Sequence, residues 1–133
     1  MKKALLFGAL ALAGVTALSA TSALAKAAGP VAALDTDDDG TVDLKEINKS
    51  ATDLFTRLET DSDGTVDIKE LKGRVSKKDF KTADPDNDGT LSKDEYLTMV
   101  SSLFKDADPD NDGTLDAKEL ASKKGKALLR VTR

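Results

Sequence analysis

DPDNDGTLSKDE, residues 84–95, is one of four twelve-residue copies of a single unit in this chain. The other copies are DTDDDGTVDLKE (35–46), ETDSDGTVDIKE (59–70) and DPDNDGTLDAKE (108–119). We number these segments loops 1 to 4 in chain order. Every copy has acids at positions 1, 3 and 5, Gly at position 6, an apolar residue at position 8 and Glu at position 12. A pattern repeated four times is a structural unit rather than a chance arrangement.

The fixed positions have the chemistry of a loop that surrounds a hard cation. Acids at positions 1, 3 and 5 place three carboxylates around one point, the backbone carbonyl of position 7 adds an oxygen, and Glu at position 12 adds two more. Gly at position 6 permits a turn that a side chain would obstruct. The pattern resembles the EF-hand loop. The alternative is an acidic turn without a metal, but carboxylates held this close repel one another unless a cation neutralises them.

The metal ligands predicted from this pattern occupy positions 1, 3, 5, 7 and 12 of each loop. They are Asp35, Asp37, Asp39, Thr41 and Glu46 in loop 1; Glu59, Asp61, Asp63, Thr65 and Glu70 in loop 2; Asp84, Asp86, Asp88, Thr90 and Glu95 in loop 3; and Asp108, Asp110, Asp112, Thr114 and Glu119 in loop 4.

The spacing of the loops predicts how they pair. Successive loops begin 24 or 25 residues apart, which leaves room for a single helix between neighbours, and apolar residues at helical spacing predict helices over 47–58 and 96–107. The middle connector is weaker, because Gly73 disfavours a helix and Ser76 is a candidate N-cap. A bend there would set loop 2 beside loop 3 and loop 1 beside loop 4. A straight connector would instead pair loop 1 with loop 3 and loop 2 with loop 4.

Contacts between the apolar residues at position 8 distinguish these two arrangements. The bent connector predicts that Val66 meets Leu91 and that Val42 meets Leu115 in short strand pairings. Further along the chain, Leu120, Leu128 and Leu129 are expected to cover the remaining apolar face, with an interruption near Gly125.

The N-terminal segment has the pattern of a secretory signal peptide over residues 1–25. Lys2 and Lys3 precede an apolar run, and Ala23-Leu24-Ala25 provides a small-x-small cleavage site before Lys26. A membrane anchor is the alternative, but the run is rich in Ala and only weakly hydrophobic. We therefore expect an exported protein whose metal-binding domain spans residues 26–133.

Composition narrows the chemistry further. The chain has 24 acidic and 20 basic residues, and the acids other than Asp53, Asp79 and Asp106 all lie in the four loops. It contains no His and no Cys, so ions that require imidazole or thiolate ligands have none here. An enzyme is disfavoured, because every clustered carboxylate is already a predicted ligand and none is left for acid-base chemistry. A sensor with a Met-lined groove is also disfavoured, because Met99 is the single Met after residue 25.

Four features together resemble the lanmodulin family of periplasmic lanthanide-binding proteins: the signal peptide, the loop spacing, Pro at position 2 (Pro85 and Pro109) and the segment ELKGRVS over residues 70–76. The resemblance covers essentially the whole chain. It implies an all-α EF-hand fold, a compact three-helix bundle with four metal loops and short strand pairings between them. It also implies selectivity for lanthanide(III) over calcium, folding driven by metal, and a weaker fourth site. Position 9 belongs to the family pattern and adds the candidate ligands Asp43, Asp67, Ser92 and Asp116.

The chain departs from the family at several positions. Position 2 is Thr36 in loop 1 and Thr60 in loop 2, position 9 of loop 3 is Ser92, and loop 2 begins with Glu59. The weakest loop is therefore expected to be either loop 2, because of Glu59, or loop 4, as the resemblance implies.

The sequence leaves two functions open. We expect up to four lanthanide(III) ions as ligands, and a periplasmic calcium-binding protein, either buffer or sensor, is the alternative because both kinds of ion require oxygen ligands. Expected partners are metal ions, without nucleic acid or, after cleavage of the signal peptide, membrane. The protein is expected to be a monomer, and no protein partner is predicted.

Overall fold

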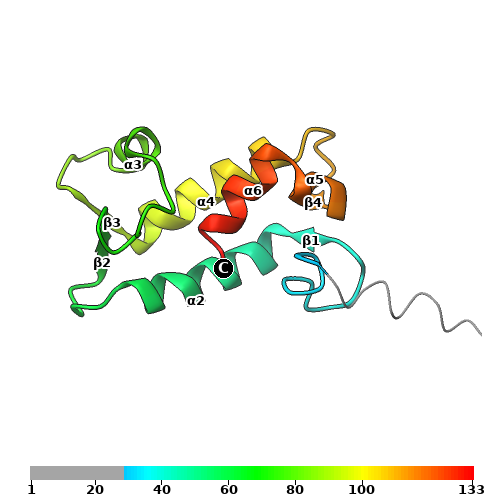
Figure 1. Cartoon of the computed structure of the whole chain (residues 1–133), viewed down its shortest axis with the longest axis horizontal. Helices are drawn as coiled ribbons and strands as arrows, with labels where there is room; N and C mark the ends of the chain where they lie inside the picture. Colours follow the sequence, from blue (N-terminus) through cyan, green and yellow to red (C-terminus); the bar gives the residue numbers. More distant parts are fainter. Residues whose placement is uncertain (1–28) are drawn as a thin grey trace, which may run out of the picture.

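A computed structural model describes residues 29–133, and the expected signal peptide over residues 1–25 lies outside this range. The described chain contains short strands in the loops and helices between and after them (Figure 1). In order these are β1 (Val42–Asp43), α2 (Leu44–Leu58), β2 (Thr65–Asp67), α3 (Lys77–Ala83), β3 (Thr90–Ser92), α4 (Lys93–Ala107), β4 (Thr114–Leu115), α5 (Ala117–Ala121) and α6 (Lys123–Arg130). Within this range no helix combines the length and apolar character needed to cross a membrane.

The two long helices begin inside the metal loops. The position 9 side chain of loop 1 is the N-cap of α2, and that of loop 3 is the N-cap of α4. Asp43 accepts a hydrogen bond from the Glu46 N–H at 2.8 Å, and Ser92 accepts one from the Glu95 N–H at 3.2 Å. In both cases the Glu side chain accepts a hydrogen bond from the backbone N–H of the cap residue, which completes a capping box. Helices α2 and α4 therefore start three residues before the positions predicted from apolar spacing, 47 and 96.

The loops pair in the nested order predicted from the bent connector. β1 pairs with β4 in antiparallel register, with Val42 opposite Leu115, and β2 pairs with β3, with Val66 opposite Leu91. All four of these side chains are fully buried. The two strand pairs lie at opposite ends of the molecule, separated by α2 and α4 (Figure 1). Each of these helices has 15 residues and is therefore about 22 Å long.

The bend lies where the sequence predicts it. After β2 the chain turns through Lys72 (φ 51°) and Gly73 (φ 77°), two successive residues with left-handed backbone. Ser76 then caps α3 by accepting a hydrogen bond from the Asp79 N–H at 3.1 Å. The chain therefore reverses between loops 2 and 3, which brings their strands together.

The core is one apolar cluster between α2, α4 and the C-terminal segment. The apolar residues that follow helical spacing on α2 are buried, namely Ile47, Ala51, Leu54, Phe55 and Leu58. On α4, Val100, Phe104 and Ala107 are buried, whereas Leu97 and Leu103 are only partly buried. Tyr96 and Met99 complete the buried face of α4. Burial raises the pKa of Tyr96 to about 12, and its hydroxyl donates to the Val131 carbonyl at 2.8 Å.

The expected bundle of three helices consists of α2, α4 and α6, to which the short helices α3 and α5 are added. The C-terminal end lies between the long helices (Figure 1). Ser50 of α2 donates to the Thr132 carbonyl at 2.6 Å, and Arg74 of the bend donates to the Arg133 carbonyl at 2.6 Å. The C-terminal residues thus connect α2, α4 and the bend.

The expected interruption near Gly125 is displaced. The helix breaks at Ser122, which ends α5 and caps α6, and α6 continues through Gly125. Gly125 is instead a close contact: a Cβ added there would lie 2.2 Å from the Glu119 carbonyl oxygen and 2.5 Å from the Leu120 Cα. The absence of a side chain lets α6 fold back against α5.

We predict that Gly125→Ala destabilises the metal-loaded protein by about 1–3 kcal/mol, because the new methyl group forces α5 and α6 apart. The measurement is thermal unfolding of the metal-saturated protein, followed by circular dichroism. Gly29→Ala is the matched control, because no atom lies within 4 Å of a Cβ at that position. Equal stability of both variants would show that α5 and α6 separate without cost.

Candidate metal centres

All four loops have left-handed backbone at the same two positions, 4 and 6. Gly at position 6 has a φ between 86° and 90° in every loop, as the sequence pattern requires. Position 4 also has left-handed backbone, which the sequence analysis did not identify. Its occupants are Asp38 (φ 64°), Ser62 (φ 65°), Asn87 (φ 56°) and Asn111 (φ 61°). Asn and Asp tolerate this conformation better than most residues, and that preference is the signal that could have revealed it.

Backbone amides orient the carboxylates, as loop 3 illustrates. The two oxygens of Asp84 accept from the Gly89 N–H at 3.0 Å and the Asp88 N–H at 3.2 Å. Asp86 accepts from the Asp88 N–H at 3.3 Å, and Asp88 accepts from the N–H and hydroxyl of Thr90, both at 2.8 Å. In each case a side-chain carboxylate accepts from a backbone N–H further along the loop. Position 1 accepts from position 6, position 3 from position 5, and position 5 from position 7.

The same three links recur in the other loops. The position 6 N–H donates to position 1 at 2.9 Å in loops 1 and 2 and at 3.0 Å in loop 4. Glu59, which has one methylene more than Asp, reaches the Gly64 N–H at the same 2.9 Å. The longer side chain therefore folds back into the loop and occupies the place of the Asp carboxylate.

Each loop gathers three carboxylates whose ligand oxygens lie within 4.8 Å of one another. In loops 1 and 2 these come from positions 1, 3 and 5, and in loops 3 and 4 they come from positions 1, 3 and 12. The groups are Asp35, Asp37 and Asp39; Glu59, Asp61 and Asp63; Asp84, Asp86 and Glu95; and Asp108, Asp110 and Glu119. Carboxylate groups of this density suit a hard cation that prefers oxygen ligands.

The remaining predicted ligands lie beside these groups rather than in them. In loops 3 and 4, the position 5 acids Asp88 and Asp112 accept hydrogen bonds from the amides of position 7. In loops 1 and 2, the position 12 residues Glu46 and Glu70 accept hydrogen bonds from position 2. The side chains of position 9 cap the backbone that follows: Asp43, Asp67, Ser92 and Asp116 each accept from the N–H of the Glu three residues later. Their role as ligands remains a prediction.

The acids of position 3 have raised pKa values in all four loops, because desolvation and contacts with neighbouring carboxylates oppose their ionisation. Desolvation and the charge of Asp39 raise the pKa of Asp37. For Asp61, the hydrogen bond from the Asp63 backbone lowers the pKa, but desolvation and the Asp63 charge outweigh it. Contact with the position 1 carboxylate contributes to the raised pKa in loops 3 and 4, at Asp86 and Asp110. The negative charge of each loop is thus least well tolerated at position 3.

Position 1 behaves in the opposite way in loops 3 and 4. Desolvation raises the pKa of Asp84, but hydrogen bonds from the Gly89 amide and its neighbours outweigh this effect and lower it. The same balance lowers the pKa of Asp108, with Gly113 as the main donor. The amides of loops 3 and 4 therefore favour the ionised form of the position 1 carboxylate, which is the form that binds a cation.

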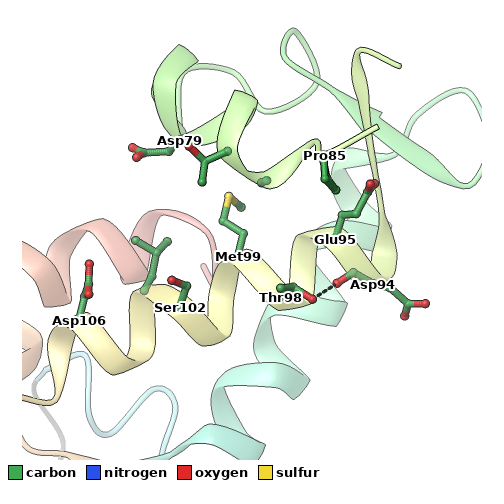
Figure 2. A pocket seen from close by; sticks show the side chains of 11 residues that line it. Asp79, Pro85, Asp94, Glu95, Thr98, Met99, Ser102 and Asp106 are labelled. Carbon is green, nitrogen blue, oxygen red and sulfur yellow. Dashed lines mark hydrogen bonds between the residues drawn. The ribbon is translucent and has the colours of Figure 1, made fainter. Parts of the chain in front are cut away.

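A groove of about 410 Å³ lies between α3 and α4 (Figure 2). Met99 and Leu103 contribute apolar surface, and Asp79, Asp94 and Asp106 are among its acidic lining residues. Among residues 29–133, the groups of three acids that could hold an ion are those of the four loops. Of the residues that line the groove, Glu95 belongs to such a group, that of loop 3.

Comparison with known proteins identifies three of the four loops. The sequence model of the EF-hand family, described as EF hand, matches residues 32–49, 78–101 and 99–122, which contain loops 1, 3 and 4. Loop 2 lies outside the matched segments. It begins with Glu59 instead of Asp, and no helix directly follows it. No curated protein matches the chain.

We predict that the affinity for metal falls as the pH falls, because protons compete with the cation for the loop carboxylates. The acids of position 3 have raised pKa values, so in the metal-free loops their protonation begins at a higher pH than the ordinary Asp pKa of 3.8 implies. Equilibrium dialysis at several pH values between pH 7 and pH 3 measures the dissociation constant of the metal. Asp53→Asn, outside the loops, is the control and should leave the curve unchanged. A dissociation constant that does not rise as the pH falls would contradict the prediction.

Proposed function

We propose that this chain, which matches the EF-hand family over residues 32–49, 78–101 and 99–122 and has four acidic loops, binds lanthanide(III) ions selectively and with high affinity in the periplasm. The observation that carries this proposal is the set of four carboxylate groups, each with ligand oxygens within 4.8 Å. Such groups suit a hard cation that accepts oxygen ligands. We propose a role in binding rather than in catalysis, with metal ions as ligands and the monomer as the working unit.

The surplus of carboxylates supports a trivalent ion. Loops 1, 2 and 4 each have five acids at positions 1, 3, 5, 9 and 12, so a divalent ion leaves a larger negative charge than a trivalent one. One further unit of cation charge opposite one carboxylate at about 2.4 Å is worth on the order of 7 kcal/mol at an effective dielectric constant of about 20. Dehydration of the trivalent ion opposes this gain. The resemblance to the lanmodulin family therefore carries the choice of metal.

Calcium is the second candidate, and the match to the EF-hand family favours it. The family pattern supplies six or more oxygens at the spacing that calcium requires. The fixed positions of the loops suit both ions, because both accept carboxylate and carbonyl oxygens. The selectivity of the protein therefore depends on the net charge and the rigidity of each loop rather than on the types of ligand.

Metal binding and folding are coupled in this proposal. Desolvation and, after it, the charges of neighbouring acids raise the pKa values of the position 3 acids, so the ionised carboxylates of the folded loops are less stable without a cation. The chain has no Cys and therefore no disulfide to hold this fold together. A cation removes the repulsion and stabilises the paired loops, and its binding free energy becomes folding free energy.

We predict that helix content rises sharply when metal is added to the chain in excess chelator, because the metal-free loops repel each other and the core is small. Far-ultraviolet circular dichroism is the measurement. A chain already fully helical in chelator would contradict coupled folding, whichever ion is preferred.

We predict that a lanthanide is bound far more tightly than calcium. Competition dialysis with both ions present tests this directly, and sub-stoichiometric lanthanide should displace calcium from the loops. If calcium at about micromolar concentration saturates the loops and lanthanide does not displace it, the protein is a calcium-binding protein.

A further inference from the structure

The four loops differ at position 2, next to the first carboxylate. Loops 1 and 2 have Thr36 and Thr60 there, and loops 3 and 4 have Pro85 and Pro109. Thr offers a backbone N–H and a hydroxyl as hydrogen-bond donors. Pro offers neither, because its nitrogen is part of the ring. Position 2 therefore decides whether donors are present beside the position 1 carboxylate.

In loops 1 and 2 these donors bind the Glu of position 12. The N–H and hydroxyl of Thr36 both donate to Oε1 of Glu46, the hydroxyl at 3.0 Å. In loop 2 the N–H of Thr60 donates to Oε1 of Glu70 at 3.0 Å, and its hydroxyl donates to the same oxygen at 2.8 Å. The second oxygen of each Glu accepts the N–H of position 9, from Asp43 at 3.0 Å and from Asp67 at 3.1 Å. Both oxygens of these two Glu residues are thus occupied.

In loops 3 and 4 one oxygen of the Glu is left without a donor. Oε2 of Glu95 accepts the Ser92 N–H at 2.8 Å, and Oε2 of Glu119 accepts the Asp116 N–H at 2.9 Å. Among residues 29–133, no hydrogen bond reaches Oε1 of either side chain. Figure 2 shows the Glu95 side chain extending from α4 toward Pro85, with no bond to it.

The carboxylates that are grouped in each loop differ according to the residue at position 2. Glu95 and Glu119 join the carboxylates of positions 1 and 3 in their loops. Glu46 and Glu70 do not, and position 5 supplies the third carboxylate in loops 1 and 2. The Glu of position 12 is thus gathered with the other ligands where position 2 is Pro, and outside that group where position 2 is Thr.

We propose that Thr36 and Thr60 are positioning residues that hold Glu46 and Glu70 and so delay metal binding in loops 1 and 2. The proposal rests on the proposed function and adds an order of filling to it. A Glu that binds a cation through both oxygens needs a lone pair of each. In loops 1 and 2, Oε1 already accepts two hydrogen bonds, so a cation must displace at least one of them. Loops 3 and 4 have no such bond to break.

The strand pairing determines the order in which the loops bind metal, because it couples each Thr loop to a Pro loop. Each pair joins a loop that has Thr at position 2 to a loop that has Pro: loop 1 with loop 4, and loop 2 with loop 3. The Pro loop of each pair binds first and fixes its strand. The Thr loop then binds against an ordered partner. Loop 3 therefore fills before loop 2, and loop 4 fills before loop 1.

The test is a stepwise titration of the full chain with La³⁺, followed by the backbone amide signals of the position 6 glycines in ¹⁵N NMR spectra. These report one loop each: Gly40, Gly64, Gly89 and Gly113. In the unmodified chain, Gly89 and Gly113 should reach their bound positions before Gly40 and Gly64. In the double variant Thr36→Pro/Thr60→Pro, all four should shift together, with affinities of loops 1 and 2 raised about tenfold. Pro is the chosen substitution because loops 3 and 4 have it at position 2 and share the left-handed backbone of positions 4 and 6 with loops 1 and 2.

Two further variants separate the hydrogen bonds from the shape of the residue. Thr36→Ser/Thr60→Ser keeps both donors and should preserve the order of filling. Thr36→Val/Thr60→Val keeps the N–H but removes the hydroxyl, and it should give an intermediate gain even if the Pro variant folds poorly. An unchanged order in both the Pro and the Val variants, or weaker binding in loops 1 and 2, would overturn the proposal. Repeating the titration with Ca²⁺ separates the two hypotheses, because the order of filling does not depend on which ion the protein prefers.

Discussion

The antiparallel pairing of loop strands is the constraint on which the rest of the structure depends. Val42 with Leu115, and Val66 with Leu91, are fully buried where two loops meet. A strand of two or three residues has no stability by itself, so each loop acquires its shape only with its partner. Helices α2 and α4 connect one pair to the other, and the core between them holds the two pairs apart. A metal bound in one loop therefore fixes part of the neighbouring loop as well.

The metal loops and the helices share residues, which links binding to folding. The position 9 side chain caps the helix that follows loops 1 and 3, and the Glu of position 12 is both the last predicted ligand of the loop and a member of the capping box. A cation that draws in this Glu acts directly on the first turn of α2 or α4. In loops 1 and 2, Thr at position 2 donates hydrogen bonds to this Glu from the opposite end of the loop. Loops 3 and 4 have Pro at position 2, and there, within the described part of the chain, the Glu side chain accepts a hydrogen bond from position 9 alone.

Most of the architecture could be predicted from the sequence, because the loops impose it locally. Loop spacing, Gly73 and Ser76 together predict the bend and the nested pairing, and both are confirmed. What could not be predicted depends on contacts across the loop. The hydrogen bonds of Thr36 to Glu46 join residues ten positions apart. The helix starts were missed because the residue of position 9, interpreted as a ligand, acts as an N-cap. The role of Gly125 depends on the packing of α5 against α6.

The most direct test of this account is to disable one loop and measure the affinity of the others. Asp84→Ala with Glu95→Ala removes two of the three grouped carboxylates of loop 3 and leaves the other three loops intact. Stepwise titration with La³⁺ then gives the affinity of loop 2 from the Gly64 amide signal and that of loop 1 from the Gly40 signal. Because loop 2 pairs with loop 3 and loop 1 pairs with loop 4, the account predicts that loop 2 is weakened more than loop 1. Equal weakening of the two loops, or a larger effect on loop 1, would contradict it.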